Sequence, residues 1–330
     1  MNVVRQRTLN GHTAAVNAVR FTSDGSYCMT CSDDKTVRLW NPHKDDVATE
    51  GNALLIKTYS GVHGYQIFDI SISTDKTKFA TAGGDRTSFL WDVASGRIIR
   101  RLQGHSQRVN AVHLNEAGTL QYTGSYDKTL CVWDLKSNMR EPIQTLSEFR
   151  DSVTSVTTTR NQIIASSVDG AIRVYDIRMG ELHTDELNYP VTHMQLSHDQ
   201  KCLTAACLGG DVHLMDVNTG VLLQRYSGRV HNSFKLESSF CHDATHICGA
   251  SEDGSVKFWH QVTGNQLPVQ YFEAPNRETP IGAVNNSASS DRMHKSPIYS
   301  VANHPSLNIF VAASSDGSAS CCTYEQAHPM

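Results

Sequence analysis

Residues Gly104 to Asp134, GHSQRVNAVHLNEAGTLQYTGSYDKTLCVWD, decide the fold of this chain. Val109 to Leu114 and Leu120 to Thr123 carry the apolar, β-branched and aromatic residues that are typical of strands. Leu130 to Trp133 predicts a third strand, and Tyr126-Asp127-Lys128 indicates a tight turn before it. The stretch therefore predicts three short antiparallel strands.

The same stretch contains four polar or indole side chains that can form one buried chain of hydrogen bonds. We expect Asp127 to accept from His105, His105 to contact Ser125, and Ser125 to contact the indole N–H of Trp133. Buried polar groups must find partners inside the protein, and each such bond contributes on the order of 1 kcal/mol. This chain of contacts would support the three strands from one side.

The pattern recurs along the whole sequence at a period of roughly 40 to 45 residues. Taking Asp127 as the anchor, the equivalent positions are Asp34, Asp85, Asp169, Gly209, Asp253 and Asp316. The Trp positions are Trp40, Trp91, Trp133, Tyr175, Met215, Trp259 and Cys322. The His positions are His12, His63, His105, Ser147, Leu187, His231 and His294, and the Ser positions are Ser32, Gly83, Ser125, Ser167, Cys207, Ser251 and Ser314.

The repeats differ in how completely they keep this set. The first and third have it in full, as His12, Ser32, Asp34 and Trp40, and as His105, Ser125, Asp127 and Trp133. The sixth has it if His231 is the right histidine, although Gly228-Arg229 is an alternative for the Gly-His pair. The fifth has lost every member, so we expect it to open most easily.

This Gly-His to Trp-Asp repeat resembles the WD repeat, which implies an all-β, seven-bladed β-propeller. Residues 1–330 then form one domain with two insertions, 43–53 and 274–295. The chain ends soon after its last third strand, whereas Val3 to Leu9 resembles a fourth strand without a blade of its own. We predict that this N-terminal strand completes the last blade, closes the ring and removes an open sheet edge.

Composition limits the functional classes. With 39% hydrophobic residues and no run of 18 apolar residues, the chain predicts a globular protein without a transmembrane helix. The nine cysteines are odd in number and scattered, which favours a reduced protein without a disulfide framework. The net charge of −4 argues against direct nucleic-acid binding. We expect neither a metal ion nor any other cofactor, since residues three apart in a strand, as in Cys28 to Cys31, face opposite sides.

The two insertions are expected on opposite faces of the ring. Residues 43–53 are polar and acidic and lie between the third and fourth strands of the first blade. Residues 274–295 should emerge on the face of the Asp turns, and a long loop of this kind in a compact domain is often functional. It contains Thr279-Pro280 and ends at Ser296-Pro297, which are minimal sites for a proline-directed kinase.

No catalytic motif is present, and Ser-His pairs that repeat at fixed spacing indicate blade supports, so we expect no enzyme. Function should then lie on the exposed rims. The top mouth of the channel is predicted to display residues three and five past each His and the residue before each turn Asp. Because aromatic residues and arginine dominate binding energy at interfaces, the candidate partner-binding residues are Phe68, Arg108, Tyr126, Arg150 and Tyr299, together with Asp33.

Several segments resemble the mitogen-activated protein kinase organiser family over nearly the whole chain. They include Trp40-Asn41-Pro42, the Leu55 to Tyr65 segment, Leu90 to Gly96, Ser166 to Gly170, Tyr175 to Gly180 and Ser251 to Gly254. The resemblance implies a small scaffold that gathers proteins of a MAP kinase cascade. We expect a monomer that is cytoplasmic, with the nucleus as a second location. Members of that family are also found among spliceosome-associated proteins.

Two alternatives remain open. Tyr175-Asp176-Ile177-Arg178 resembles the W-D-x-R box with which some propellers act as substrate receptors of a cullin ubiquitin ligase, with Tyr in place of Trp. The second alternative is a structural subunit of a splicing complex that contacts RNA only indirectly. Nuclear or cytoplasmic location would separate splicing from signalling.

Overall fold

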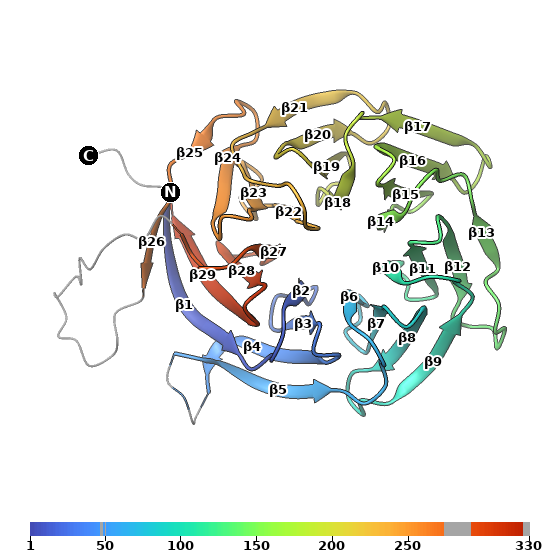
Figure 1. The fold of residues 1–330 in the computed structure, drawn as a ribbon, viewed down its shortest axis with the longest axis horizontal. Helices are drawn as coiled ribbons and strands as arrows, with labels where there is room; N and C mark the ends of the chain where they lie inside the picture. Colours follow the sequence, from blue (N-terminus) through green and yellow to red (C-terminus); the bar gives the residue numbers. More distant parts are fainter. Residues whose placement is uncertain (47–48, 50, 274–291, 326–330) are drawn as a thin grey trace.

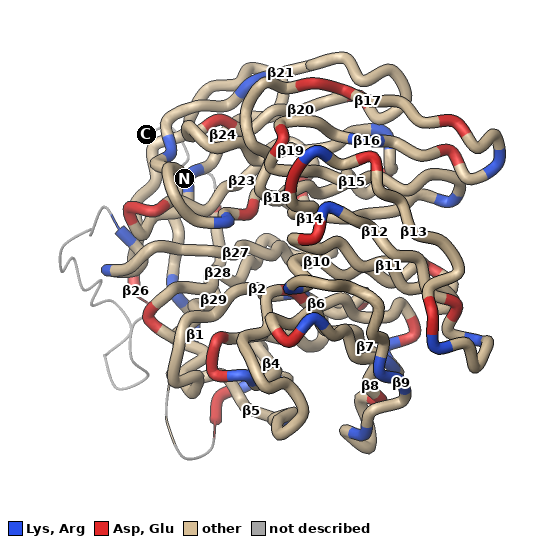
Figure 2. Tube along the Cα trace, turned by 45° about the vertical axis from the view of Figure 1, so that its right-hand side comes forward, with Lys and Arg blue, Asp and Glu red and all other residues tan. Residues whose placement is uncertain are grey.

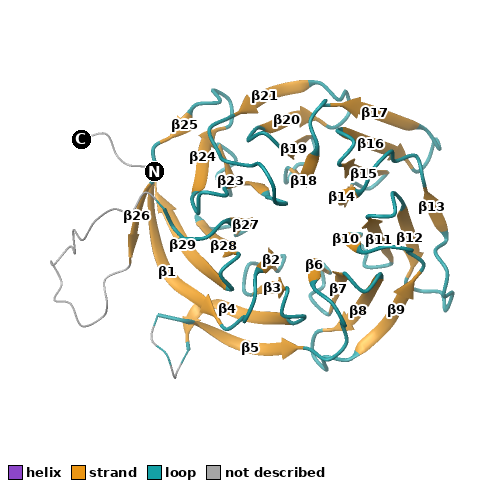
Figure 3. Cartoon of the chain, viewed as in Figure 1, coloured by secondary structure: helices purple, strands orange, loops and turns teal. Residues whose placement is uncertain are grey.

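A computed structural model describes residues 1–46, 49, 51–273 and 292–325, which form seven β-sheets arranged in a ring (Figure 1). All regular structure in the described residues is β-strand, and no helix occurs among them (Figure 3). Successive strands of each sheet, or blade, follow one another from the centre of the ring to its perimeter and pair antiparallel, except for the outermost strand of blade 7, which pairs in parallel. The predicted seven-bladed propeller is therefore confirmed.

Blades 1 to 4 each contain four strands in sequence order, with the innermost first. Blade 1 consists of β2 (Val16–Phe21), β3 (Cys28–Ser32), β4 (Val37–Asp45) and β5 (Ala53–Tyr59). Blade 2 consists of β6 (Ile67–Ile72), β7 (Lys78–Gly83), β8 (Thr87–Asp92) and β9 (Ile98–Gln103). Blade 3 consists of β10 (Val109–Leu114), β11 (Leu120–Ser125), β12 (Leu130–Asp134) and β13 (Gln144–Leu146). Blade 4 consists of β14 (Val153–Thr158), β15 (Gln162–Ser167), β16 (Ala171–Asp176) and β17 (Leu182–Glu186).

Blades 5 and 6 repeat this arrangement, and blade 7 combines both ends of the chain. Blade 5 consists of β18 (Val191–Leu196), β19 (Cys202–Cys207), β20 (Val212–Asp216) and β21 (Leu222–Tyr226). Blade 6 consists of β22 (Ser238–Phe240), β23 (His246–Ala250), β24 (Val256–His260) and β25 (Gln266–Leu267). Blade 7 has five strands: β27 (Ile298–Asn303), β28 (Ile309–Ser314), β29 (Ser318–Glu325), β1 (Asn2–Asn10) and β26 (Gln270–Glu273).

The hydrophobic core lies between neighbouring blades. One cluster joins Met29 and Leu39 of blade 1 to Ile67, Phe79 and Trp91 of blade 2. Middle strands such as β3 are buried along their whole length because a blade covers each face, so they are apolar or small throughout. Several outer strands carry charged residues, such as Arg100 and Arg101 of β9, and Figure 2 shows charges mainly in loops and at the perimeter.

The N-terminal strand closes the ring as predicted. β1 pairs antiparallel with β29, from Asn2 opposite Glu325 to Asn10 opposite Ser318. Val3 and Leu9 of β1 are each only 1% exposed, because they fill the space beside blades 6 and 1. The last blade is therefore completed by the first residues of the chain.

Before the second insertion, the sequence pattern predicts one fourth strand for blade 6, from Leu267 to Phe272, and this prediction is wrong as a single element. The segment divides at Pro268: the two residues of β25 pair with β24, whereas β26 pairs in parallel with β1 on the outside of blade 7. Proline lacks the N–H that a continuous ladder needs, and its carbonyl instead accepts the N-terminal ammonium group of Met1 at 2.7 Å.

The first insertion is partly ordered by strand pairing. β4 extends to Asp45, which pairs with Ala53, and Arg7 Nε donates to Asp45 Oδ1 at 2.6 Å. Of the second insertion, residues 274–291, including the predicted Thr279-Pro280 site, lie outside the described residues. Ser296-Pro297 lies inside them, where the Pro297 carbonyl accepts the backbone N–H of Ser315 at 2.9 Å.

Candidate functional site

Three blades contain a complete buried chain of polar side chains. In blade 3, His105 Nδ1 lies 3.0 Å from Asp127 Oδ2, and His105 Nε2 lies 2.8 Å from Thr123 Oγ1. The indole N–H of Trp133 donates to the same Thr123 hydroxyl at 2.8 Å. The matching sets are His12, Thr30, Asp34 and Trp40 in blade 1, and His63, Thr81, Asp85 and Trp91 in blade 2.

The predicted role of Ser32 and Ser125 in these chains is therefore wrong. Trp133 pairs with Gln121 across the sheet, so Thr123 lies diagonally beside the indole, while Ser125 is two residues further along at the turn. The Ser125 hydroxyl instead donates to the Arg108 carbonyl at 2.8 Å, and Ser32 donates to the Ala14 carbonyl at 3.1 Å. The three complete sets share one sequence feature, a threonine four residues before the turn Asp, and this feature would have identified them.

Blade 7 keeps its histidine, since His294 Nδ1 lies 3.3 Å from Asp316 Oδ2, but blade 4 replaces it. In blade 4 the residue that follows the His position, Arg150, donates its backbone N–H to Asp169, as Ser106 does to Asp127. Phe149, not the predicted Ser147, therefore occupies the His position, and Arg173 forms the ion pair with Asp169 at 2.9 Å. Both arginine and phenylalanine are buried here, and the guanidinium stacks 5.0 Å from the Phe149 ring.

In blade 6 the alternative Gly228-Arg229 is correct, and His231 is not the histidine of a polar set. The Arg229 carbonyl lies against Gly210 of the preceding turn. The carbonyls of His294 and His12 lie in the same way against Gly254 and Gly317, so Arg229 occupies the His position of blade 6. His231 Nε2 instead lies 2.8 Å from the Phe234 carbonyl. Trp259 donates to the Ser227 carbonyl at 2.8 Å, since glycine stands at position 249.

The buried histidines respond differently to their surroundings. Burial lowers the pKa of His105, but Asp127 and Cys131 outweigh it and raise the pKa to about 9. Burial also lowers the pKa of His12, and there the bond to Asp34 does not compensate because Arg38 repels the imidazolium.

The residue five positions after each His position mainly connects neighbouring blades. In six blades the inner strand has a bulge at this position, and four bulged residues donate to a backbone carbonyl of the next blade. They are Asn17 to Ile67 at 2.8 Å, Asn110 to Val153 at 2.9 Å, Thr154 to Val191 at 2.7 Å and Thr192 to Leu236 at 3.1 Å. The other two bulged residues are Phe68 and Tyr299, whose rings cannot form this joint.

Three of the predicted rim residues come together on blades 2 and 3. The Arg108 guanidinium lies 5.5 Å from the centre of the Phe68 ring and 4.8 Å from the centre of the Tyr126 ring. Tyr126 is 49% exposed and the adjacent Tyr65 is 62% exposed. Phe68, Arg108 and Tyr126, which we call the arginine–aromatic cluster, form the candidate binding site.

The remaining predicted residues lie elsewhere on the rim. Tyr299 packs against Phe234 with ring centres 5.3 Å apart, and Asp33 accepts a hydrogen bond from Asn17 at 2.7 Å. Asp33 and Glu252 both raise the pKa of Tyr299, although burial is the larger cause. We call Asp33, Phe234, Glu252 and Tyr299 the acidic–aromatic group.

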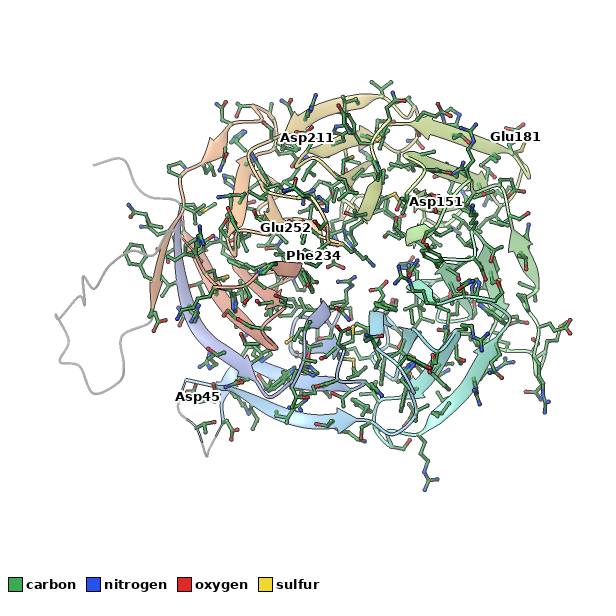
Figure 4. All side chains as sticks on the ribbon, in the orientation of Figure 1. Asp45, Asp151, Glu181, Asp211, Phe234 and Glu252 are labelled. Atoms are coloured by element: carbon green, nitrogen blue, oxygen red, sulfur yellow. The ribbon has the colours of Figure 1, made fainter. Side chains whose placement is uncertain are left out.

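Glu252 also organises the loop that carries Phe234. Its carboxylate accepts the backbone N–H groups of Asn232, Ser233 and Phe234 at 2.8, 2.7 and 3.2 Å. Figure 4 shows Phe234 and Glu252 beside each other on the inner side of blade 6. Arg150 belongs to neither group, because the register of blade 4 differs by two residues, and its guanidinium lies 3.8 Å from Glu186.

Below the mouth, a charged network that the sequence analysis missed connects the inner strands. Arg20 Nη2 donates to Asp69 Oδ1 at 2.8 Å, and Glu237 lies within 2.8 Å of the same guanidinium. Lys235 of blade 6 donates to the Asn110 carbonyl of blade 3 at 3.3 Å. Charged residues thus bridge blades that are not neighbours.

Comparison with known sequences agrees with this geometry. The family described as WD domain, G-beta repeat matches residues 4–41, 54–92, 96–134, 140–176, 222–260 and 287–321. These ranges cover more than half of the chain. The chain belongs to the WD-repeat family. The unmatched residues 177–221 contain the first three strands of blade 5, the repeat that has lost every residue of the pattern, yet all four strands of that blade are formed.

Named WD-repeat relatives cover most of the chain. The WD repeat domain-containing protein 83 homolog of Dictyostelium discoideum is 30% identical over 94% of this chain and 95% of its own length. The WD repeat domain-containing protein 83 of Homo sapiens is 42% identical over 79% of this chain, and that of Rattus norvegicus 41% over 80%, covering 80% and 82% of those proteins. The predicted resemblance to the MAP kinase organiser family is confirmed at this level.

The described part of this WD-repeat protein offers no metal centre, since no three His, Cys, Asp or Glu side chains in it are placed to hold an ion. It also contains no helix of the length and apolarity that crossing a membrane would require. All nine cysteines are free thiols. What the described rim presents is a set of side chains suited to binding a protein.

Proposed function

We propose that this protein is a non-enzymatic scaffold that binds partner proteins through its top rim and organises components of MAP kinase signalling. The observation that supports this most is the arginine–aromatic cluster: the exposed Arg108 guanidinium lies beside two aromatic rings and forms no ion pair with any residue that the structure describes. Aromatic residues and arginine contribute most of the energy at protein interfaces. The names of the relatives make no statement about kinases.

The repeated Ser, His and Asp side chains favour a scaffold over a hydrolase. Ser125 Oγ donates to a backbone carbonyl, and His105 is occupied by Asp127 and Thr123 on both ring nitrogens. A nucleophilic serine needs a histidine that is free to take its proton. We further propose a monomer that is cytoplasmic, with the nucleus as a second location, and that makes no direct nucleic-acid contact.

Two other functions are weaker candidates. A cullin substrate receptor would use Asp176 and Arg178, but Asp176 accepts the backbone N–H groups of Arg178 and Met179 at 2.8 and 3.0 Å, as a turn requires. Ile177 and Met179 beside this turn are exposed, so a cullin adaptor could still contact this surface and the role can be tested. A structural role in splicing would use the same rim with different partners.

The test is affinity capture from a lysate of the source organism, followed by mass spectrometry. Arg108→Ala combined with Tyr126→Ala should remove specific partners while leaving the unfolding temperature unchanged. The matched control is Arg140→Ala combined with Tyr27→Ala, which removes exposed residues of the same types away from the cluster. Kinase-cascade proteins, splicing factors or a cullin adaptor among the lost partners would decide between the three roles, and an unchanged partner list would contradict docking at this rim.

A further inference from the structure

We propose that the arginine–aromatic cluster binds a carboxylate or phosphoryl group on an acidic segment of a partner protein. This inference rests on the proposed docking function and adds the chemistry of the ligand. The segment would lie over blades 2 and 3 of the rim.

The geometry of Arg108 defines what it can still bind. Rings of Phe68 and Tyr126 lie against the guanidinium, at 5.5 and 4.8 Å. Stacking of this kind uses the π-face and the charge but none of the in-plane N–H donors. Those donors form a fork that matches two oxygens of a carboxylate or phosphate.

No carboxylate of the described chain uses this fork. Arg5, Arg7, Arg20, Arg173 and Arg225 each have a carboxylate within ion-pair distance, whereas no ion pair of Arg108 occurs in the part of the chain that the structure describes. Aromatic rings therefore hold Arg108 in place, and its charge remains available to a ligand. Gly84 lets Tyr65 and Phe68 pack closely against its backbone, because a Cβ there would lie 3.1 Å from Tyr65 and 3.5 Å from Phe68.

The turns around the cluster carry additional positive charge. The residue after the turn Asp is basic in blades 1, 2 and 3, as Lys35, Arg86 and Lys128, and all three are exposed. Blades 4 to 7 have glycine at the same position, as Gly170, Gly210, Gly254 and Gly317. Each of the three basic residues has a positive φ, of 67°, 61° and 67°. They lack ion pairs with any described residue, so they can attract an acidic segment over about one Debye length of roughly 8 Å.

Two acidic side chains stand at other places on the mouth, Glu252 in blade 6 and Asp33 in blade 1. Both would repel a negatively charged segment. Attraction at Arg86, Arg108 and Lys128 of blades 2 and 3 and repulsion at these two carboxylates would together fix where an acidic segment lies. The same carboxylates and the net charge of −4 disfavour a nucleic acid, whose phosphates need a continuous basic track.

Selection of peptides tests the ligand chemistry directly. A phage library of random dodecapeptides is selected on the full-length protein, and the enriched peptides are synthesised with a fluorescent label for anisotropy titration. We expect enrichment of Asp and Glu next to an apolar residue. Arg108→Gln should weaken these peptides about tenfold to a hundredfold, since a charge-assisted bidentate contact is lost.

Variants separate geometry from net charge. Arg108→Lys keeps the charge but not the fork, so it should also weaken binding severalfold, whereas the exposed control Arg140→Gln should bind as the parent does. Replacing one acidic residue of the peptide by phosphoserine distinguishes the two sources: tighter binding assigns a phosphoryl ligand, and unchanged or weaker binding assigns a carboxylate.

Three outcomes would overturn the inference: selected peptides without acidic residues, no binder that is sensitive to Arg108→Gln, or duplex DNA that competes better than the peptides. Uncharged peptides that still depend on Arg108 and Tyr126 would refute acidic recognition but leave the docking function intact. Loss of partner capture in lysate without any effect on the peptides would affect only the docking function.

Discussion

Arg20 and Glu237, which lie 217 residues apart in the sequence, form a two-pronged ion pair inside the ring, with nitrogen–oxygen distances of 2.7 and 2.8 Å. Arg20 belongs to blade 1, whereas Glu237 directly precedes the inner strand of blade 6. The ion pair thus joins the two blades on either side of blade 7, and Ser300 of blade 7 also donates to Glu237. Because the Glu237 side chain is only 1% exposed, its charge depends on this guanidinium.

Removing that carboxylate should destabilise the protein strongly. Glu237→Ala leaves the Arg20 charge partly buried with Asp69 as its only described acidic partner, so we expect the free energy of unfolding to fall by about 3 kcal/mol. Urea unfolding followed by tryptophan fluorescence measures the change. Glu116→Ala, in an exposed turn, is the control, and a loss below about 1 kcal/mol in Glu237→Ala would mean that water replaces the pair.

Stability should also depend on pH in the acidic range. Burial raises the pKa of Glu237, but Arg20 and His193 outweigh it and lower the pKa to about 2, while burial lowers the pKa of His193 to about 4. Both pKa values are depressed by folding, so both contributions are full above the unfolded pKa and are lost as pH falls. We expect unfolding free energy to decline from about pH 6.5 downward, with His193→Asn flattening the part between about 6.5 and 4.

The alkaline side should show the opposite dependence. Folding raises the pKa of His105 to about 9, because Asp127 and Cys131 outweigh the effect of burial. This contribution is full below the unfolded pKa of about 6.5 and is lost as pH rises through 9. Unfolding free energies between pH 6.5 and 9.5 should fall in the parent protein. His105→Asn should remove the part of that slope below about pH 8.5, while the buried thiols, whose pKa values folding raises, keep the part above it; a parent protein with no slope would contradict a charged His105.

The middle residue of the polar chains can be tested in blade 3. Thr123→Val keeps the shape but removes the hydroxyl that Trp133 and His105 share, so we expect a loss of about 1 to 3 kcal/mol. Thr184→Val in the exposed strand β17 is the matched control and should change little. Equal stabilities of the two variants in urea would show that water satisfies the indole and the imidazole.

The blades could be located from the sequence because one fixed spacing recurs in every repeat. Trp133 and Asp127 keep a fixed spacing that strand pairing imposes, and the spacing survives even where Met215 and Cys322 replace tryptophan. The middle residue of the polar chain was misplaced because Ser125 and Thr123 lie on the same face, two residues apart. Periodicity alone cannot choose between them; their distance from the Trp133 indole does.

The rim was predicted less completely because it depends on contacts between blades. The shift of blade 4 to Phe149 is visible only through the backbone bond of Arg150 to Asp169. Blade 6 lacks the bulge of the other inner strands, which brings Glu237 into line with Asp69. Single-repeat patterns contain no information about which carbonyl of the next blade a side chain reaches.

The closing strand gives the last prediction. Deleting residues 2–10 exposes the edge of β29 and removes the parallel partner of β26, and Val3 and Leu9 no longer fill the core of two blade interfaces. The unfolding temperature measured by calorimetry should therefore fall markedly. Leu9→Ala alone should cost about 2 to 5 kcal/mol, whereas Gln6→Ala, whose side chain is exposed, should cost little. A deletion variant that melts at the parent temperature would show that the ring does not need its N-terminal strand.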